Sequence, residues 1–285
     1  DTAHKLDRFY EVNLPELLEA KNVENFLYFY AFFRRQAFDI GDLGVEAIRL
    51  VSVDYARGVG NSLKVQVYEA LRHVAQGFLD FRANKLQEDT DTLKAIYDNS
   101  LIVLYRLLFI FYAEARELLP VRENAGYRES YSLENLKKDI QKSLDAHKLL
   151  LPSTGMLWPY LKTLFGIIDE GSPPLSVATF NGGLFDAKRH PFLEKYAVGD
   201  QHLQLAIDKL ARVGGQFVDY RDLAERHLGT IYEGLLEFHL EKAEPAESGW
   251  TVVLKTMKGE RKASGSYYTP DYIVKYMVEE ALGPV

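Results

Sequence analysis

The sequence contains no cysteine, which excludes disulfide bonds and metal sites built from thiolates. A chain without disulfides suits a reducing compartment, so we expect the cytoplasm. Long apolar runs are also missing. The longest, from Leu101 to Ala113, is interrupted by Arg106 and is too short to span a bilayer. No signal-peptide pattern is visible, and we expect no membrane partner.

Positive charge is in deficit, with 34 Lys and Arg against 41 Asp and Glu and a formal net charge of -7. A surface-wide DNA-binding role is therefore not expected, because phosphate contact needs a basic footprint. Small basic clusters remain, and their usual location is a solvated surface. Arg261 and Lys262 are the pair best placed to reach a DNA phosphate. The seven histidines form no His-x-x-x-His pair, so the sequence predicts no metal site.

Apolar residues recur at helical spacing along most of the chain, with capping residues before them. Residues 48–53 are either a short strand or a helix end, and residues 169–192 form a long turn-rich stretch. Within that stretch Asn181-Gly182-Gly183 favours positive φ, and Phe180, Leu184 and Phe185 are expected to hold the turn on the core. The predicted helix starts are Asn13, Asn22, Ser62, Thr90 or Thr92, Ser132, Leu157, Asp200, and Asp219 or Asp222.

The expected fold is mainly α, a multi-helix bundle of roughly eight to eleven helices with a small β element near residues 250–262. Residues 1–249 would form a helical connector domain, and residues 250–285 would begin a second domain. The helix from Asp200 is expected to end at Gly214 and Gly215, and the next to carry Phe238 on its apolar face. Two glycines in that helix indicate close packing against another backbone.

Two apolar helices raise questions of burial. The stretch from Phe26 to Phe33 holds six aromatic residues, which cannot all face one side, so we expect a helix buried on most of its surface. An aromatic platform for nucleic acid is the alternative, although such platforms usually interleave basic residues. The helix ending near Leu118 is predicted to be the centre of the bundle. Its charged residues Arg106, Glu114 and Arg116 should form ion pairs, because a buried charge needs a partner.

The last two dozen residues form a loop that opens a helix. Thr269 is a good N-cap, Pro270 suits the first helical position, and Asp271 places negative charge beside the positive helix end. An apolar face follows, with Ile273, Met277 and Ala281 at its centre and Val274, Val278 and Leu282 beside it. A helix start with free N–H groups beside two tyrosines can hold a small anion such as a carboxylate.

The string Gly265-Ser-Tyr-Tyr-Thr-Pro270, followed by Ile273-Val274 and an amphipathic helix, resembles motif X of adenine-specific DNA methyltransferases. The resemblance is to type IIG restriction-modification enzymes and to PglX-like phage-defence methyltransferases. Interior strings at residues 101–120, 181–186 and 228–236 are also typical of that family. The resemblance implies that Gly265, Tyr267, Tyr268, Thr269 and Pro270 bind S-adenosylmethionine.

Three other patterns are set aside. Gly58-Val-Gly60 precedes motif X, whereas the glycine-rich loop of this methyltransferase class follows it, so we expect a plain loop. Ser172-Pro-Pro-Leu175 lacks the aromatic residue that stacks on a flipped base, which favours a proline turn. Asp169, Asp186 and Lys188 have the residue types of a magnesium-dependent nuclease, but the region lacks a strand scaffold. No catalytic residue is predicted in this chain.

The resemblance implies a helical connector from an enzyme that methylates adenine N6 in double-stranded DNA. The missing initial methionine and the abrupt end after the motif X helix indicate an excised piece, which we expect to be inactive alone. Its partners would be the methyltransferase and nuclease domains of the same chain, with Mg²⁺ in an upstream nuclease domain where one is present. The alternative is a free-standing helical adaptor that binds a protein or nucleic acid, in which the motif X string is merely a capped helix.

Overall fold

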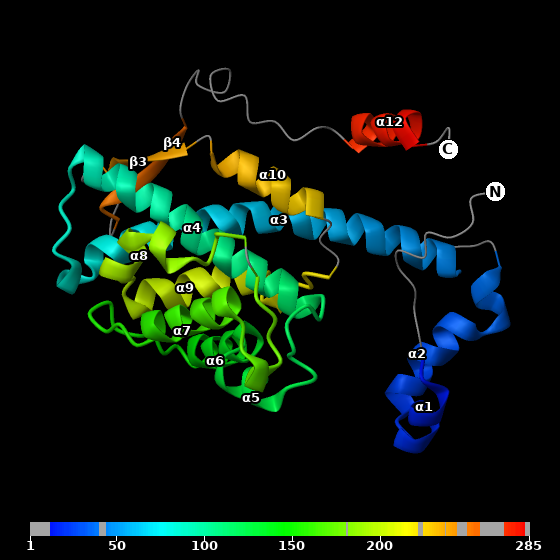
Figure 1. Cartoon of the computed structure of the whole chain (residues 1–285). Helices are drawn as coiled ribbons and strands as arrows, with labels where there is room; N and C mark the ends of the chain where they lie inside the picture. Colours follow the sequence, from blue (N-terminus) through cyan, green and yellow to red (C-terminus); the bar gives the residue numbers. More distant parts are fainter. Residues whose placement is uncertain are drawn as a thin grey trace. The chain divides into compact units, whose positions relative to one another are not determined.

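The computed structural model describes residues 12–39, 44–180, 182–221, 225–236, 238–243, 250–256 and 271–282. The fold is mainly α, as predicted, and the described residues include two small antiparallel hairpins, of which the one nearer the C-terminus was expected (Figure 1). The chain divides into two compact units, residues 1–58 and 59–285. In chain order the described elements are α1 (Leu14–Ala20), α2 (Val23–Phe33), η1 (Arg35–Phe38), α3 (Val45–Asp80), η2 (Arg82–Asn84), α4 (Thr90–Ala115), α5 (Ala125–Ser130), α6 (Leu133–Asp145), α7 (Leu157–Glu170), η3 (Pro173–Leu175), η4 (Ala187–Arg189), α8 (Pro191–Lys195), α9 (Asp200–Ala211), β1 (Arg212–Val213), β2 (Gln216–Phe217), α10 (Glu225–Leu235), β3 (Phe238–Lys242), β4 (Val252–Thr256) and α12 (Asp271–Leu282).

The first unit begins with two capped helices. The side chain of Asn13 accepts from the Glu16 N–H at the start of α1, and Asn22 does the same for Glu24 at 2.9 Å in α2. Both predicted helix starts are confirmed.

The predicted burial of the aromatic helix is wrong. In α2 the exposed fraction is 48% for Phe26, 63% for Tyr28 and 52% for Tyr30. Its rings pack on each other instead, with Phe29 stacked on Phe33 at 5.2 Å between centroids. Short elements such as α1 and η1 offer too little surface to cover so many rings.

Helix α3 is much longer than expected. It begins at Val45, not Ser62, so residues 48–53 are helical and Gly58 and Gly60 lie inside a helix, not in a loop. A glycine costs about 1 kcal/mol relative to alanine in a helix interior. Two such costs are small for a helix of 36 residues, which is why the glycines do not end it.

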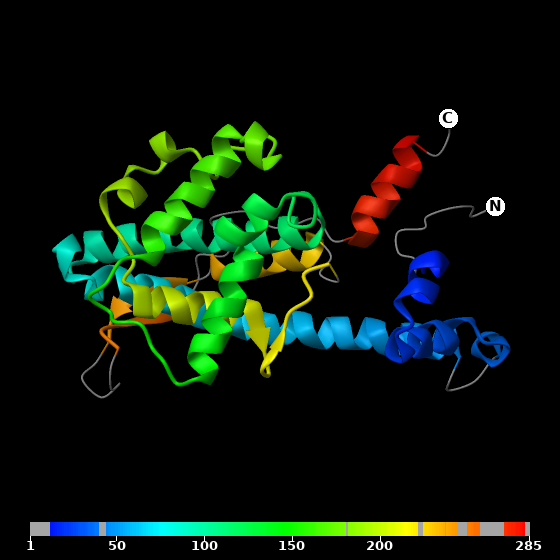
Figure 2. The ribbon, with the colours of Figure 1, turned by 90° about the horizontal axis from the view of Figure 1, so that it is seen from below.

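Helix α4 is the centre of the second unit, as predicted. It contacts α6, α8, α9 and β3 (Figures 1 and 2). Val103, Leu104, Leu107 and Ile110 are fully buried on it. By length and composition α4 is also a candidate membrane span among the described residues, but most of it is buried against other helices.

The turn-rich stretch after α7 is held on the core by aromatic contacts, as predicted. Phe109 of α4 lies 5.5 Å from the ring of Phe180 and 5.4 Å from that of Phe185. Gly183 has a φ of +74°, a conformation that favours glycine. The predicted positive φ is therefore confirmed at Gly183, whereas Asn181 lies outside the described residues.

Two boundaries differ from expectation near the end of this unit. Helix α9 ends at Ala211, and strand β1 follows it directly. Gly214 and Gly215, with φ values of +58° and +81°, form the turn of the β1–β2 hairpin and lie beyond the end of the helix. Phe238 belongs to β3, which pairs antiparallel with β4, so the β element includes a strand that was predicted to be helical. Leu240 and Val252 of this hairpin are buried in the helical core.

The predicted close packing of α10 occurs at Gly234, although against side chains. A Cβ atom there would lie 2.9 Å from the hydroxyl of Tyr68 and 3.4 Å from the Lys64 side chain, both on α3. Figure 1 shows α10 beside α3.

The crossing of α3 and α9 is closer still, and it yields a prediction. A Cβ atom on Gly77 would lie 2.5 Å from Val198 Cγ1 and 2.8 Å from His202 Cβ. We expect Gly77→Ala to lower the free energy of unfolding by about 1–3 kcal/mol, measured by urea denaturation. Gly166→Ala is the matched control, since nothing lies within 4 Å of its added methyl group. It should gain up to about 1 kcal/mol from helix propensity. Equal effects of the two substitutions would contradict the close crossing.

Candidate functional site

The residues predicted to bind S-adenosylmethionine lie outside the described part of the chain. They are Gly265, Tyr267, Tyr268, Thr269 and Pro270, and the predicted DNA contacts Arg261 and Lys262 lie there too. The helix predicted to follow them is present as α12. Its apolar side chains are exposed, with fractions of 43% for Val274, 59% for Met277 and 50% for Val278.

The patterns set aside in the sequence have local structural roles. Pro173 and Pro174 begin the short helix η3, which a backbone hydrogen bond between Ser172 and Val177 closes into a turn. The Asp186 carboxylate caps η4 by accepting from the Lys188 N–H at 2.8 Å, and it pairs with Arg189 at 3.4 Å. That carboxylate therefore serves as a helix cap.

A groove of about 630 Å³ opens between the C-terminal end of α4, the start of α6 and the chain after β2. Apolar side chains such as Phe111, Val121 and Val218 line part of it. Charged side chains contribute the rest, namely Arg122, Arg128, Lys137, Lys138, Arg221, Glu114, Glu117, Glu134 and Asp219. Apolar walls with convergent polar groups are typical of ligand sites, so this groove is the candidate site among the described residues.

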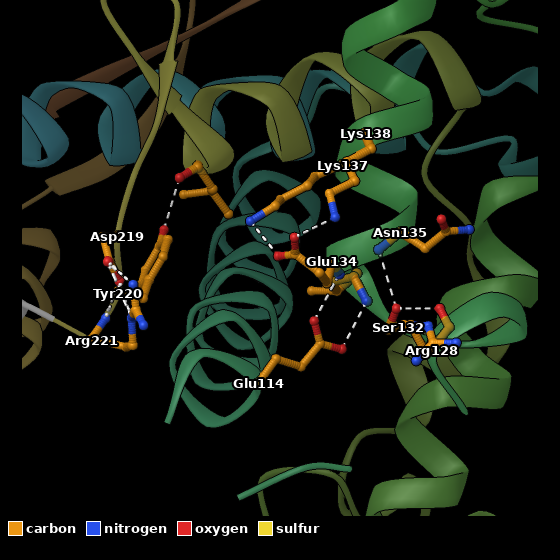
Figure 3. A network of polar contacts seen from close by, with 12 residues as sticks. Glu114, Arg128, Ser132, Glu134, Asn135, Lys137, Lys138, Asp219, Tyr220 and Arg221 are labelled. Carbon is orange, nitrogen blue, oxygen red and sulfur yellow. Dashed lines mark hydrogen bonds and ion pairs between the residues drawn. The ribbon is translucent and has the colours of Figure 1, made fainter. Parts of the chain in front are cut away.

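Glu114 lies at the inner end of the groove and caps a helix from a distance. Its carboxylate accepts from the N–H groups of Leu133 at 2.9 Å and Glu134 at 2.7 Å, the first two residues of α6. It also accepts from the hydroxyl of Tyr127 at 2.9 Å. Ser132 accepts from the third N–H, so the first turn of α6 is fully bonded (Figure 3).

The ion pairs predicted for this helix are not found among the described residues. Glu114 uses backbone donors at the positive end of α6, and burial raises its pKa to about 7. Arg106 donates to the Leu184 carbonyl at 2.8 Å and stacks on Phe165 at 4.9 Å. Arg116 lies over the ring of Tyr112. Peptide groups and aromatic faces thus replace the charged partners expected for these three residues.

The cations at the rim of the groove are paired with carboxylates. Glu134 bonds both Lys137 at 2.5 Å and Lys138 at 2.9 Å, and Figure 3 shows the three side chains converging. Arg221 pairs with Asp219 at 2.6 Å on the opposite side. An anionic ligand that entered would therefore compete with a carboxylate for each of these three cations.

A second buried carboxylate repeats the long-range cap. Asp200 at the start of α9 is 2% exposed, and it accepts from the N–H groups of Met156 at 2.9 Å and Leu157 at 2.8 Å. No side chain local to the start of α7 caps it. The sequence had indicated Asp200 as the start of its own helix, and the structure assigns its carboxylate to α7.

Comparison with known proteins finds no matching family model, no similar curated protein and no similar solved structure. The groove was not predicted, because it joins residues from 111 to 221 that share no short motif. The one usable signal was the charge of Glu114 inside an apolar run, which indicated a buried carboxylate but not its partner.

Proposed function

We propose that this chain is the helical connector of an adenine-specific DNA methyltransferase of the type IIG or PglX-like kind. The observation that carries the proposal is the string Gly265-Ser-Tyr-Tyr-Thr-Pro270 directly before helix α12. The start of a helix suits the anionic end of an amino-acid cofactor, and S-adenosylmethionine has such an end. The mainly α fold before it is compatible with a spacer.

In this proposal the chain supplies one wall of the cofactor pocket and sets the distance between domains. The intact enzyme, cytoplasmic and with its methyltransferase domain, would methylate adenine N6 in double-stranded DNA. An upstream nuclease domain with Mg²⁺ would add cleavage. The 285-residue chain alone should be inactive, and DNA methylation by the purified chain would contradict that statement.

The test uses the full-length protein that contains this chain and measures transfer of labelled methyl groups to DNA. We expect Thr269→Val and Tyr268→Ala to lower methylation by at least about tenfold, the equivalent of about 1.4 kcal/mol in the transition state. Thr163→Val, the same chemical change on an exposed position of α7, is the matched control and should have no effect.

Circular dichroism should show that all three variants keep their helices. Full methylation activity in the Thr269 and Tyr268 variants would favour the alternative function, a helical adaptor. In that case the string before α12 would be a helix cap alone.

A further inference from the structure

Two histidines far apart in the sequence meet where α3 and α9 cross. Nδ1 of His73 lies 3.1 Å from Nδ1 of His202, and both side chains are largely buried. The close approach of the two helices at Gly77 leaves the rings little room to separate. A spacing motif could not have revealed this pair.

Asp80 determines where the protons of the pair lie. Its Oδ2 is 2.9 Å from His202 Nε2, and a carboxylate only accepts, so His202 carries a proton on Nε2. In the neutral ring the other nitrogen, Nδ1, is then an acceptor. His73 must therefore donate from its own Nδ1.

The same cluster holds the start of strand β4. Gln76 donates to Asp80 at 2.8 Å, and its carbonyl oxygen accepts from the N–H groups of Thr251 at 3.0 Å and Val252 at 3.3 Å. The centroid of the Trp250 ring lies 4.9 Å from that of the His73 ring. The Arg72 guanidinium lies over the Trp250 ring, 3.9 Å from its centroid. Residues 250–252 thus depend on the side chains that surround the histidine pair.

We propose that His73, His202 and Asp80 form a proton-sensitive latch that holds residues 250–252, and with them the start of β4, on the helical bundle. Protonation of both rings is not tolerated, because both Nδ1 atoms then become donors and two positive charges face each other at 3.1 Å.

The charged neighbours of the pair strengthen this behaviour. Arg72 of α3 and Lys209 of α9 are cations, and Asp80 is the carboxylate bonded to the pair. Burial, followed by the charges of His202, Lys209 and Arg72, lowers the pKa of His73 to about 3. A histidine freed from the cluster binds a proton near pH 6.5, so acid favours the open state over that range.

The direction of the pH dependence follows from proton linkage. The pKa of His73 is depressed in the closed state, so the stabilisation is complete above pH 6.5 and is lost as pH falls toward 3. The opening equilibrium of residues 250–252 should rise by up to about tenfold for each pH unit below 6.5.

Amide hydrogen exchange of the 285-residue chain tests the latch at pH 7.5, 6 and 5, after correction for the intrinsic exchange rate. EDTA is included, since facing imidazoles also attract divalent metals. We expect protection of Thr251 and Val252 to fall with acid while Leu161 to Ile168 of α7 stays protected. Equal loss in both segments would indicate global unfolding and overturn the proposal, as would constant protection of Thr251 and Val252.

Two variants separate the latch from general packing. His73→Gln cannot titrate and should flatten the pH dependence at residues 251 and 252. Lys209→Met leaves the hydrogen bonds in place and removes a nearby cation, which raises the pKa of His73 in the closed state, so the loss of protection should level off at a higher pH than in the wild type. An unchanged pH profile in both variants would overturn the proposal. None of these results depends on methyltransferase activity.

Discussion

Replacing Glu114 with alanine should lower the free energy of unfolding by about 3–5 kcal/mol, because three buried donors lose their acceptor and a cavity remains. The donors are the N–H groups of Leu133 and Glu134 and the hydroxyl of Tyr127. Urea denaturation measures the loss. Glu117→Ala is the matched control, since Glu117 is an exposed partner of Arg122, and its effect should stay below about 1 kcal/mol.

The pH dependence gives a second readout at Glu114. Its pKa is raised to about 7 by burial, against an ordinary value of 4.5. A group with a raised pKa gives its full stabilisation below pH 4.5 and loses it as pH rises through 7, a change of about 3 kcal/mol at most. Glu114→Gln keeps an acceptor and cannot titrate, so the difference in stability between it and the wild type should vary over that range. A constant difference would contradict a raised pKa.

Replacing Asp200 with alanine should cost about 2–4 kcal/mol, since a buried side chain would be truncated and the N–H groups of Met156 and Leu157 at the start of α7 would lose their acceptor. Hydrogen exchange should quicken first in the opening turn of α7. Asp200→Asn keeps one acceptor oxygen and should recover part of the loss. Asp139→Ala, which breaks an exposed pair with Lys142, should change stability by less than about 1 kcal/mol. An Asp200→Ala variant as stable as this control would show that α7 needs no cap from α9.

The sequence predicted well what depends on neighbours along the chain. The caps Asn13, Asn22 and Ser132 act within three residues of themselves, and all three were identified. Strand β3 was missed because its partner β4 lies beyond residue 250, and no local pattern contains both strands. The extent of α3 was missed because two glycines outweighed the helical residues on either side of them.

At the candidate sites, too, the sequence did not reveal contacts between distant parts of the chain. Residue types indicated that Glu114 and Arg106 were buried charges, but the expected carboxylate–cation pairs did not form. The N–H groups at a helix start compensate part of the cost of burying a carboxylate, and their direction is known only once the helices are placed. The pairing of His73 with His202 depends likewise on how α3 crosses α9.

The long-range caps have a consequence for how this chain acquires its structure. The first turn of α7 is capped by the carboxylate of Asp200 on α9, which follows some forty residues later in the chain. Two N–H groups of α6 donate to Glu114 of α4. Isolated peptides covering α6 or α7 should therefore be less helical than their sequences suggest, because short helices are marginal alone. The order in which the ribosome releases the chain matters as well, since α7 emerges before the residue that completes it.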